Sequence, residues 1–175
     1  MNIVLIGYRC SGKTEVGKIL AKELERDFFD TDVLIEDSAG CSIETIISRD
    51  GWGHFRNIEK RIVEEVSMRD NLIIATGGGV VVDRDNVKNL KRNGLIVWLH
   101  GNAEVLKERM NREQGSGKVR PSLTGSDPLD EIREVLSIRK PLYVQAADLI
   151  VDAGVPSIQE VTNSIINALS KEIQG

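Results

Sequence analysis

Residues 7–14 constrain the possible folds of this chain more than any other segment. They read GYRCSGKT, which matches the pattern G-x-x-x-x-G-K-[ST] at every fixed position. An apolar run at 3–6 precedes them, and Val16, Ile19 and Leu20 follow at helical spacing. A strand that passes through such a loop into a helix is typical of a phosphate-binding loop, where backbone N–H groups and the helix dipole converge on one phosphate. We therefore expect the chain to bind a nucleoside triphosphate.

Within this phosphate loop, two side chains have a specific expected task. Lys13 is placed to reach the β- and γ-phosphates, and the Thr14 hydroxyl to take a position on Mg²⁺. Cys10 lies beside a helix N-terminus and a lysine, which acidify a thiol, although such a residue is more often only a small side chain that fits the loop. The candidate nucleotide-binding residues here are Gly7, Cys10, Ser11, Gly12, Lys13, Thr14 and Glu15.

Charge and composition exclude several classes of partner. The formal net charge is −4, which argues against general nucleic-acid binding, although basic residues gather between 109 and 120. No apolar run approaches the ~20 residues of a membrane-spanning helix, and the chain starts without a charged leader and cleavage site. Cys10 and Cys41 have no zinc-ligand spacing, so two reduced thiols are expected. We expect a cytoplasmic monomer with no nucleic-acid or membrane partner.

Apolar runs alternate with helical patterns along the chain. This alternation predicts an α/β fold with a parallel sheet and helices on both faces, in a single domain spanning 1–175. A helix after Ser42 is predicted to break at 51–53, and one that begins at Asp127 is predicted to end near Arg139 because Pro141 interrupts it. Buried strands are predicted at 3–6, 28–30, 72–75, 95–99 and 149–151.

Two aspartates follow the second predicted strand. In an extended Asp-x-Asp, the carboxylates of Asp30 and Asp32 would point to the same side, beside the phosphate loop. The third predicted strand ends instead in Thr76 and three glycines, so it lacks the aspartate that holds Mg²⁺ in many phosphate-loop proteins. Asp30 or Asp32 is then the nearest acidic partner for the metal. An Asx turn that merely ends the strand is the alternative.

The three glycines at 77–79 bring bare backbone to the same edge of the predicted sheet. Consecutive glycines cost conformational entropy and supply no packing, which favours the close approach of a ligand. An ordinary flexible turn is the alternative.

Three arginines have no packing reason in the local pattern. Arg56 is placed to be oriented by Glu59, three residues later on one helix. Arg139 would end a helix, where it complements the dipole. Arg120 lies in a glycine-rich stretch at 114–125 that is long for a compact domain, and could bring a cation to a transferring phosphoryl group. A solvated surface arginine is the alternative for each.

Together these motifs resemble the shikimate kinase family. They occur in order along nearly the whole chain: the phosphate loop, DTD at 30–32, FRNIE at 55–59, GGG at 77–79, RPSL at 120–123 and RKPLY at 139–143. The resemblance implies a three-layer P-loop NTPase fold like that of nucleoside monophosphate kinases, with a parallel sheet in the order 2-3-1-4-5. It also implies transfer of a phosphoryl group from ATP to the 3-hydroxyl of shikimate, with Mg²⁺, in the route to chorismate and the aromatic amino acids.

The resemblance further implies roles for single residues. Asp30 would join Thr14 at Mg²⁺, and Asp32 would orient or deprotonate the substrate hydroxyl. Arg109 would stack on adenine, and Pro156 would border the base. The implied catalytic residues are Lys13, Asp32 and Arg120. The implied substrate-binding residues are Asp32, Arg56, Gly77, Gly78, Gly79 and Arg139. A substrate-binding segment is expected at about 32–60, and a lid that carries Arg120 at about 112–125.

Two positions depart from the family pattern. The family usually has glutamate before the Phe-Arg pair, where this chain has Trp52, and leucine in the lid, where it has Ser122. We expect Trp52 to lie near the substrate clamp rather than in it and to affect helix packing. Ser122 is expected to affect lid motion. Neither change removes a charged group that the reaction requires.

Two other functions stay open. Another small-molecule kinase of this fold, for gluconate or a nucleoside monophosphate, would also use arginines, although the Asp-Thr-Asp and Phe-Arg-x-x-Glu motifs favour shikimate. A non-catalytic ATP-binding module predicts loss of Lys13, Asp32 or Arg120, and all three are present.

Overall fold

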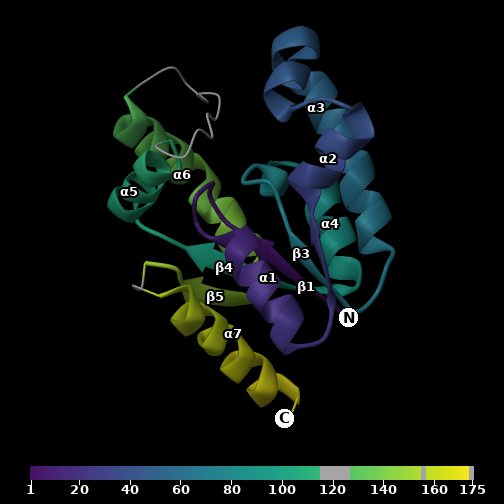
Figure 1. Cartoon of the computed structure of the whole chain (residues 1–175), viewed down its shortest axis with the longest axis vertical. Coiled ribbons are helices and arrows are strands. Elements are labelled where there is room, and N and C mark those ends of the chain that lie inside the picture. The colour runs from purple at the N-terminus through teal and green to yellow at the C-terminus, as the bar shows by residue number, and fades with distance from the viewer. Residues whose placement is uncertain (115–126, 155–156, 174–175) are drawn as a thin grey trace.

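A parallel sheet forms the centre of the molecule (Figure 1). The computed structural model describes residues 1–114, 127–154 and 157–173. Within these ranges the sheet has five strands in the order β2-β3-β1-β4-β5. The strands are β1 (Asn2–Ile6), β2 (Asp27–Asp30), β3 (Leu72–Ala75), β4 (Gly94–His100) and β5 (Leu149–Asp152). The predicted fold class and strand order are confirmed.

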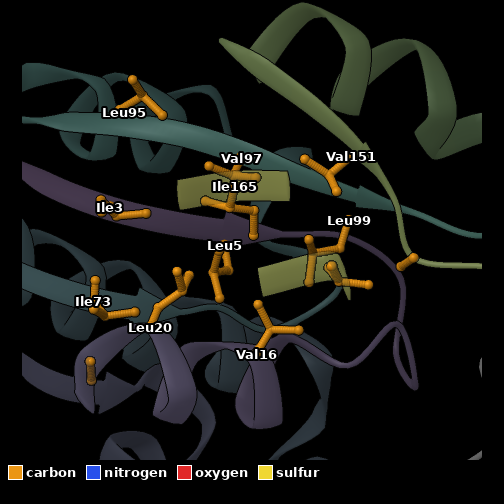
Figure 2. Packing of buried hydrophobic residues seen from close by; sticks show 13 residues of the cluster. Ile3, Leu5, Val16, Leu20, Ile73, Leu95, Val97, Leu99, Val151 and Ile165 are labelled. Carbon is orange, nitrogen blue, oxygen red and sulfur yellow. The ribbon is translucent and has the colours of Figure 1, made fainter. Parts of the chain in front are cut away.

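Helices cover both faces of the sheet, which gives the predicted three layers. They are α1 (Lys13–Glu23), α2 (Thr31–Ala39), α3 (Ile43–Ser67), α4 (Arg84–Arg92), α5 (Ala103–Gln114), α6 (Pro128–Ala146) and α7 (Ile158–Ile173), with a short 3₁₀ helix η1 (Val80–Val82). On one face, Leu20 of α1 and Ile165 of α7 pack against Leu5 and Val97 of the sheet (Figure 2). On the other face, α3, α4 and α6 pack against the alternate strand residues, such as Ile74. Both faces are buried, which explains why the strands read as continuous apolar runs.

The register places the functional segments at one edge of the sheet. Leu5 of β1 lies beside Ala75 of β3, and Ala75 lies beside Asp30 of β2. The phosphate loop, Asp30 and the glycines at 77–79 therefore leave neighbouring strands at the same level. Thr76 fixes this junction, because its backbone N and its Oγ1 both donate to the Leu5 carbonyl, at 3.2 and 2.9 Å.

Two predicted helix breaks have different outcomes. Gly51 interrupts α3 with φ 82° and ψ 169°, so the predicted break is confirmed. The prediction that Pro141 ends the helix near Arg139 is wrong, because α6 continues to Ala146. Proline removes one helical hydrogen bond, but Tyr143 and Ala146 beyond it are buried against the sheet. Their burial offsets the lost bond and keeps the last turns helical.

Among the residues that the structure describes, none of the helices has the length and apolar character needed to cross a membrane.

Candidate active site

A cleft of about 770 Å³ opens where β1, β2 and β3 end. α2 and α3 stand on one side of this end of the sheet, and α5 and α6 on the other (Figure 1). The cleft brings together most of the site residues that the sequence predicts: Cys10, Gly12, Lys13, Thr14, Glu15, Asp30, Asp32, Arg56, Gly77, Gly78, Gly79 and Arg139. The predicted residues Arg120 and Pro156 lie outside the described part of the chain, as does most of the predicted lid.

The phosphate loop curls around the ammonium group of Lys13. This side chain is 8% exposed, and its Nζ donates to the carbonyls of Gly7 and Tyr8, both at 2.8 Å. Gly12 precedes α1 in the left-handed region, with φ 91°, and offers no side-chain cap. The N-terminus of α1 therefore has no capping side chain at Gly12, which suits it to the binding of an anion.

The carboxylate of Asp30 links β2 to two other elements. Its Oδ2 accepts a hydrogen bond of 2.7 Å from Thr14 Oγ1, and its Oδ1 accepts one of 3.0 Å from the Asp32 backbone N. Asp30 is thus the N-cap of α2 and a neighbour of the phosphate loop at once. The expectation of an extended Asp-x-Asp is wrong, since α2 begins at Thr31. Both carboxylates still line the cleft.

Each glycine at 77–79, here called the glycine turn, makes room for a different element. A Cβ on Gly77 would stand 2.7 Å from Asp32 Oδ1, and one on Gly78 would stand 3.1 Å from the Arg9 backbone N. A Cβ on Gly79 would overlap the Arg56 guanidinium. The absence of side chains therefore lets the Asp32 carboxylate, the phosphate loop and Arg56 converge on one short stretch of backbone.

Arg56 is held by a buried acid, as the i+3 spacing predicts. Its Nη1 donates to Glu59 Oε2 at 2.6 Å, and Glu59 is 1% exposed. Burial raises the pKa of Glu59, and the opposing charge of Arg56 lowers it by less. The second oxygen, Oε1, has no hydrogen-bond partner among the described residues and lies 3.3 Å from the Cβ position of Gly77. Glu59 thus turns one oxygen to Arg56 and the other toward the glycine turn.

A second guanidinium reaches the glycine turn from α6. Arg139 Nη1 donates to the Gly78 carbonyl at 3.1 Å, and Tyr143 Oη donates to the same oxygen at 2.5 Å. Burial raises the pKa of Tyr143 to about 12, so the hydroxyl stays protonated, and a donor, well into alkaline pH. Because α6 continues past it, Arg139 does not complement the end of a helix.

Trp52 lies beside Arg56, four residues before it on α3. It lines the cleft, and the Arg56 guanidinium carbon stands 5.7 Å from the centre of its ring. Trp52 therefore contacts Arg56 directly, in addition to its packing within α3. The Phe55 ring lies on Arg56 as well, at 5.0 Å. These two rings and Glu59 fix the direction of the guanidinium.

Sequence reasoning missed several groups at the site. Glu131 of α6 forms a buried ion pair with Arg9 of the phosphate loop. The Tyr143 hydroxyl donates a hydrogen bond to the Gly78 carbonyl in the glycine turn. Both contacts join residues far apart in the chain, for which the sequence carries no local signal. Arg109, predicted for the base, donates to the Ala153 carbonyl at 2.5 Å. Its Nη1 lies 4.0 Å from the Cβ position of Gly12, so it lies over the phosphate loop from the side of β5.

Comparison with known proteins finds relatives that match nearly the whole chain. The shikimate kinase from Symbiobacterium thermophilum is 41% identical over 171 residues, which cover 98% of this chain and 97% of the relative. The solved shikimate kinase from Acinetobacter baumannii, in complex with shikimate, superposes with a TM-score of 0.90 at 32% identity and covers 98% of this chain and 93% of that one.

A gluconokinase from Sinorhizobium meliloti superposes with a TM-score of 0.59 at 18% identity, over 97% of this chain and 91% of that one, which shows a shared fold alone. The sequence model of the family described as "Shikimate kinase" matches residues 9–170. This chain belongs to the shikimate kinase family.

Proposed function

We propose that this chain transfers the γ-phosphoryl group of ATP to the 3-hydroxyl of shikimate, giving shikimate 3-phosphate and ADP. One arrangement carries the proposal: a single cleft joins the phosphate loop to two guanidinium groups and a carboxylate at the glycine turn. Guanidinium groups bind carboxylates bidentately, so Arg56 and Arg139 fit the carboxylate of the acid. Asp32, beside Gly77, is then left for a hydroxyl of the same molecule.

In the proposed reaction, a bond forms between the acceptor oxygen and the γ-phosphorus, and the bond from that phosphorus to the bridging oxygen of ADP breaks. Asp32 orients the hydroxyl and accepts its proton. Lys13 balances the charge of the β- and γ-phosphates, and we propose that Arg120 adds positive charge at the same phosphoryl group. Lys13, Asp32 and Arg120 are the proposed catalytic residues.

The glycine turn is proposed to offer backbone N–H groups to the acid, with Gly78 as the central residue. The nucleotide is proposed to lie on the phosphate loop, with Arg109 and Pro156 beside the base. We propose that the segment at about 32–60 binds the acid and that a lid at about 112–125 closes on the nucleotide, in a single kinase domain. Closure of the lid would exclude water and limit the hydrolysis of ATP.

Thr14 and Asp30 are the proposed Mg²⁺ site. Mg²⁺ prefers oxygen ligands, and the Thr14 hydroxyl and the Asp30 carboxylate lie together at the start of α1 and the end of β2. Mg²⁺ held by these two side chains would supply positive charge that neutralises part of the charge of the phosphates. The Asp30 carboxylate is already fixed by its bond to the Asp32 N–H, which pre-orients it for direct contact or contact through water.

The test offers four acceptors to the protein with ATP and Mg²⁺: shikimate, gluconate, AMP and CMP, each in a separate assay of ADP release. We expect turnover with shikimate alone. Turnover with gluconate or a nucleotide but not with shikimate would overturn the proposal, and the absence of any acceptor-dependent turnover would favour a binding module. We also propose a cytoplasmic monomer, and light scattering checks its mass.

A further inference from the structure

The ion pair between Arg9 and Glu131 joins two segments that the proposed reaction uses separately. Arg9 belongs to the phosphate loop, and Glu131 lies one turn inside α6. Both side chains are largely removed from solvent, with 12% and 3% exposed. A buried ion pair is hard to separate, because either partner alone would leave a charge in surroundings of low dielectric constant. The link between the loop and the helix is therefore stiff.

The same helix holds the glycine turn through two further contacts. Arg139 and Tyr143 both donate to the Gly78 carbonyl, at 3.1 and 2.5 Å. Glu131 and Arg139 are eight residues apart, or about 12 Å along an α-helix. The helix therefore contacts the phosphate loop near its start and the glycine turn two turns later.

The third side of this arrangement is the contact between the glycine turn and the phosphate loop. A Cβ on Gly78 would lie 3.1 Å from the Arg9 backbone N and 3.4 Å from the Gly7 carbonyl oxygen. Loop, turn and helix thus touch one another pairwise. A movement of α6 that carries Arg139 toward the carboxylate of a bound acid also moves Glu131, and with it Arg9.

We propose that Glu131 is a positioning residue that couples the two half-sites. By holding Arg9, it makes the position of the phosphate loop depend on the position of α6. A triphosphate that orders the loop and an acid that engages Arg139 then favour the same arrangement, so each ligand increases the affinity for the other. This inference rests on the proposed two-substrate reaction.

The experiment measures the dissociation constant of shikimate by calorimetry, without and with Mg²⁺ and a non-hydrolysable ATP analogue. The ratio of the two constants is the coupling. We expect a ratio of about 5 or more in the wild type, the lower end of typical coupling between sites. In Glu131→Gln we expect the ratio to fall to about 1, while each ligand measured alone keeps its constant to within about threefold of wild type.

Two further variants separate coupling from folding. Arg9→Met/Glu131→Leu replaces the ion pair by apolar side chains, which keeps stability because no charge is left alone in the interior. Its coupling ratio is also expected to be about 1. Glu134→Gln changes an exposed glutamate of the same helix and is expected to keep the wild-type ratio. The double variant decides the question if Glu131→Gln does not fold.

Four results would overturn the inference. The wild type could show a coupling ratio near 1, Glu131→Gln could keep the ratio of the wild type, or the double variant could recover that ratio. The fourth result is a tenfold change in the affinity of Glu131→Gln for the nucleotide alone. The last would make Arg9 a direct phosphate ligand. A wild type that turns over no shikimate defeats the proposed function instead, so the two failures are distinguishable.

Discussion

Thr14 and Asp30 are joined by a hydrogen bond of 2.7 Å between the side chain that follows Lys13 and the carboxylate that ends β2. The second oxygen of Asp30 caps α2 by accepting from the Asp32 N–H at 3.0 Å. One carboxylate therefore performs a structural task and is the proposed metal partner. These two tasks can be separated by mutation, because they use different properties of the side chain.

Asp30→Asn is expected to remove the metal task and keep the cap. Asparagine caps helices as well as aspartate does, so the melting temperature should change by only a few degrees. The Mg²⁺ concentration for half-maximal activity should rise by about 10- to 100-fold, because the negative charge is lost. Activity measured against the concentration of Mg²⁺ checks this.

Asp30→Ala should add a loss of about 1 kcal/mol in unfolding free energy. An unchanged Mg²⁺ requirement in Asp30→Asn would remove Asp30 from the metal site.

Gly79→Ala and Gly77→Ala are expected to lower kcat/KM for shikimate by about 10- to 100-fold, because small misplacements of reacting groups are costly. The added Cβ would displace the Arg56 guanidinium in the first variant and the Asp32 carboxylate in the second. These are ends of flexible side chains, so the fold should persist.

The matched control for these two variants is Gly53→Ala in α3, where a Cβ meets nothing within 4 Å. It should gain up to about 1 kcal/mol of stability and keep full activity. Steady-state kinetics and thermal melts measure all three variants. Wild-type kinetics in Gly79→Ala would show that Arg56 does not need this space.

The sequence predicts those parts of the molecule that depend on local pattern. Alternating apolar runs and helical patterns predict the three layers, and the i+3 spacing of Arg56 and Glu59 predicts their ion pair, which the structure contains. Local pattern fails where distant packing decides. It predicts a helix end at Pro141, yet the buried Tyr143 keeps α6 helical.

Contacts between distant segments leave no signal in the local sequence pattern. The bond from Arg139 to Gly78 joins residues 61 positions apart, and the pair of Arg9 and Glu131 spans 122 positions. The local sequence pattern identifies Arg139 only by type, as an arginine without a packing reason, and it does not single out Arg9 or Glu131. Their partners depend on the order of the strands and on the course of α6, which only the folded chain defines.

Both tyrosines of the chain are expected to resist ionisation in the folded protein. Tyr8 and Tyr143 are buried, which raises the pKa of Tyr8 above its ordinary value of 10.0 and that of Tyr143 to about 12. At pH 10 the folded protein should show far less than half of its phenolate absorbance, whereas the unfolded chain should show about half. The unfolding free energy should therefore be unaffected by these two hydroxyls below pH 10. It should fall as the pH rises from 10 toward about 12, because in this range the unfolded chain releases the tyrosine protons and the folded protein retains them.

A titration followed by near-ultraviolet absorbance, with and without denaturant, measures both states. Tyr143→Phe keeps the ring that stacks on Trp98 and isolates the signal of Tyr8. Half-ionisation of the folded wild type at pH 10 would show that these hydroxyls are open to solvent.

Glu59→Gln is expected to reveal a carboxyl group that makes the folded protein less stable as it ionises. Burial raises the pKa of Glu59 above its ordinary value of 4.5, and Arg56 offsets only part of this shift. Glutamine resembles the protonated acid, so the wild type and the variant should have similar unfolding free energies below about pH 4.5. Above that pH the unfolded wild type releases the proton more readily than the folded one, and the wild type should lose stability relative to the variant until the raised pKa is passed.

Urea denaturation at a series of pH values measures the difference in unfolding free energy between the wild type and Glu59→Gln. Glu64→Gln makes the same substitution at an exposed position of the same helix and is the matched control. A wild type that gains stability relative to Glu59→Gln as the pH rises would mean that the attraction to Arg56 outweighs the cost of burying the charge.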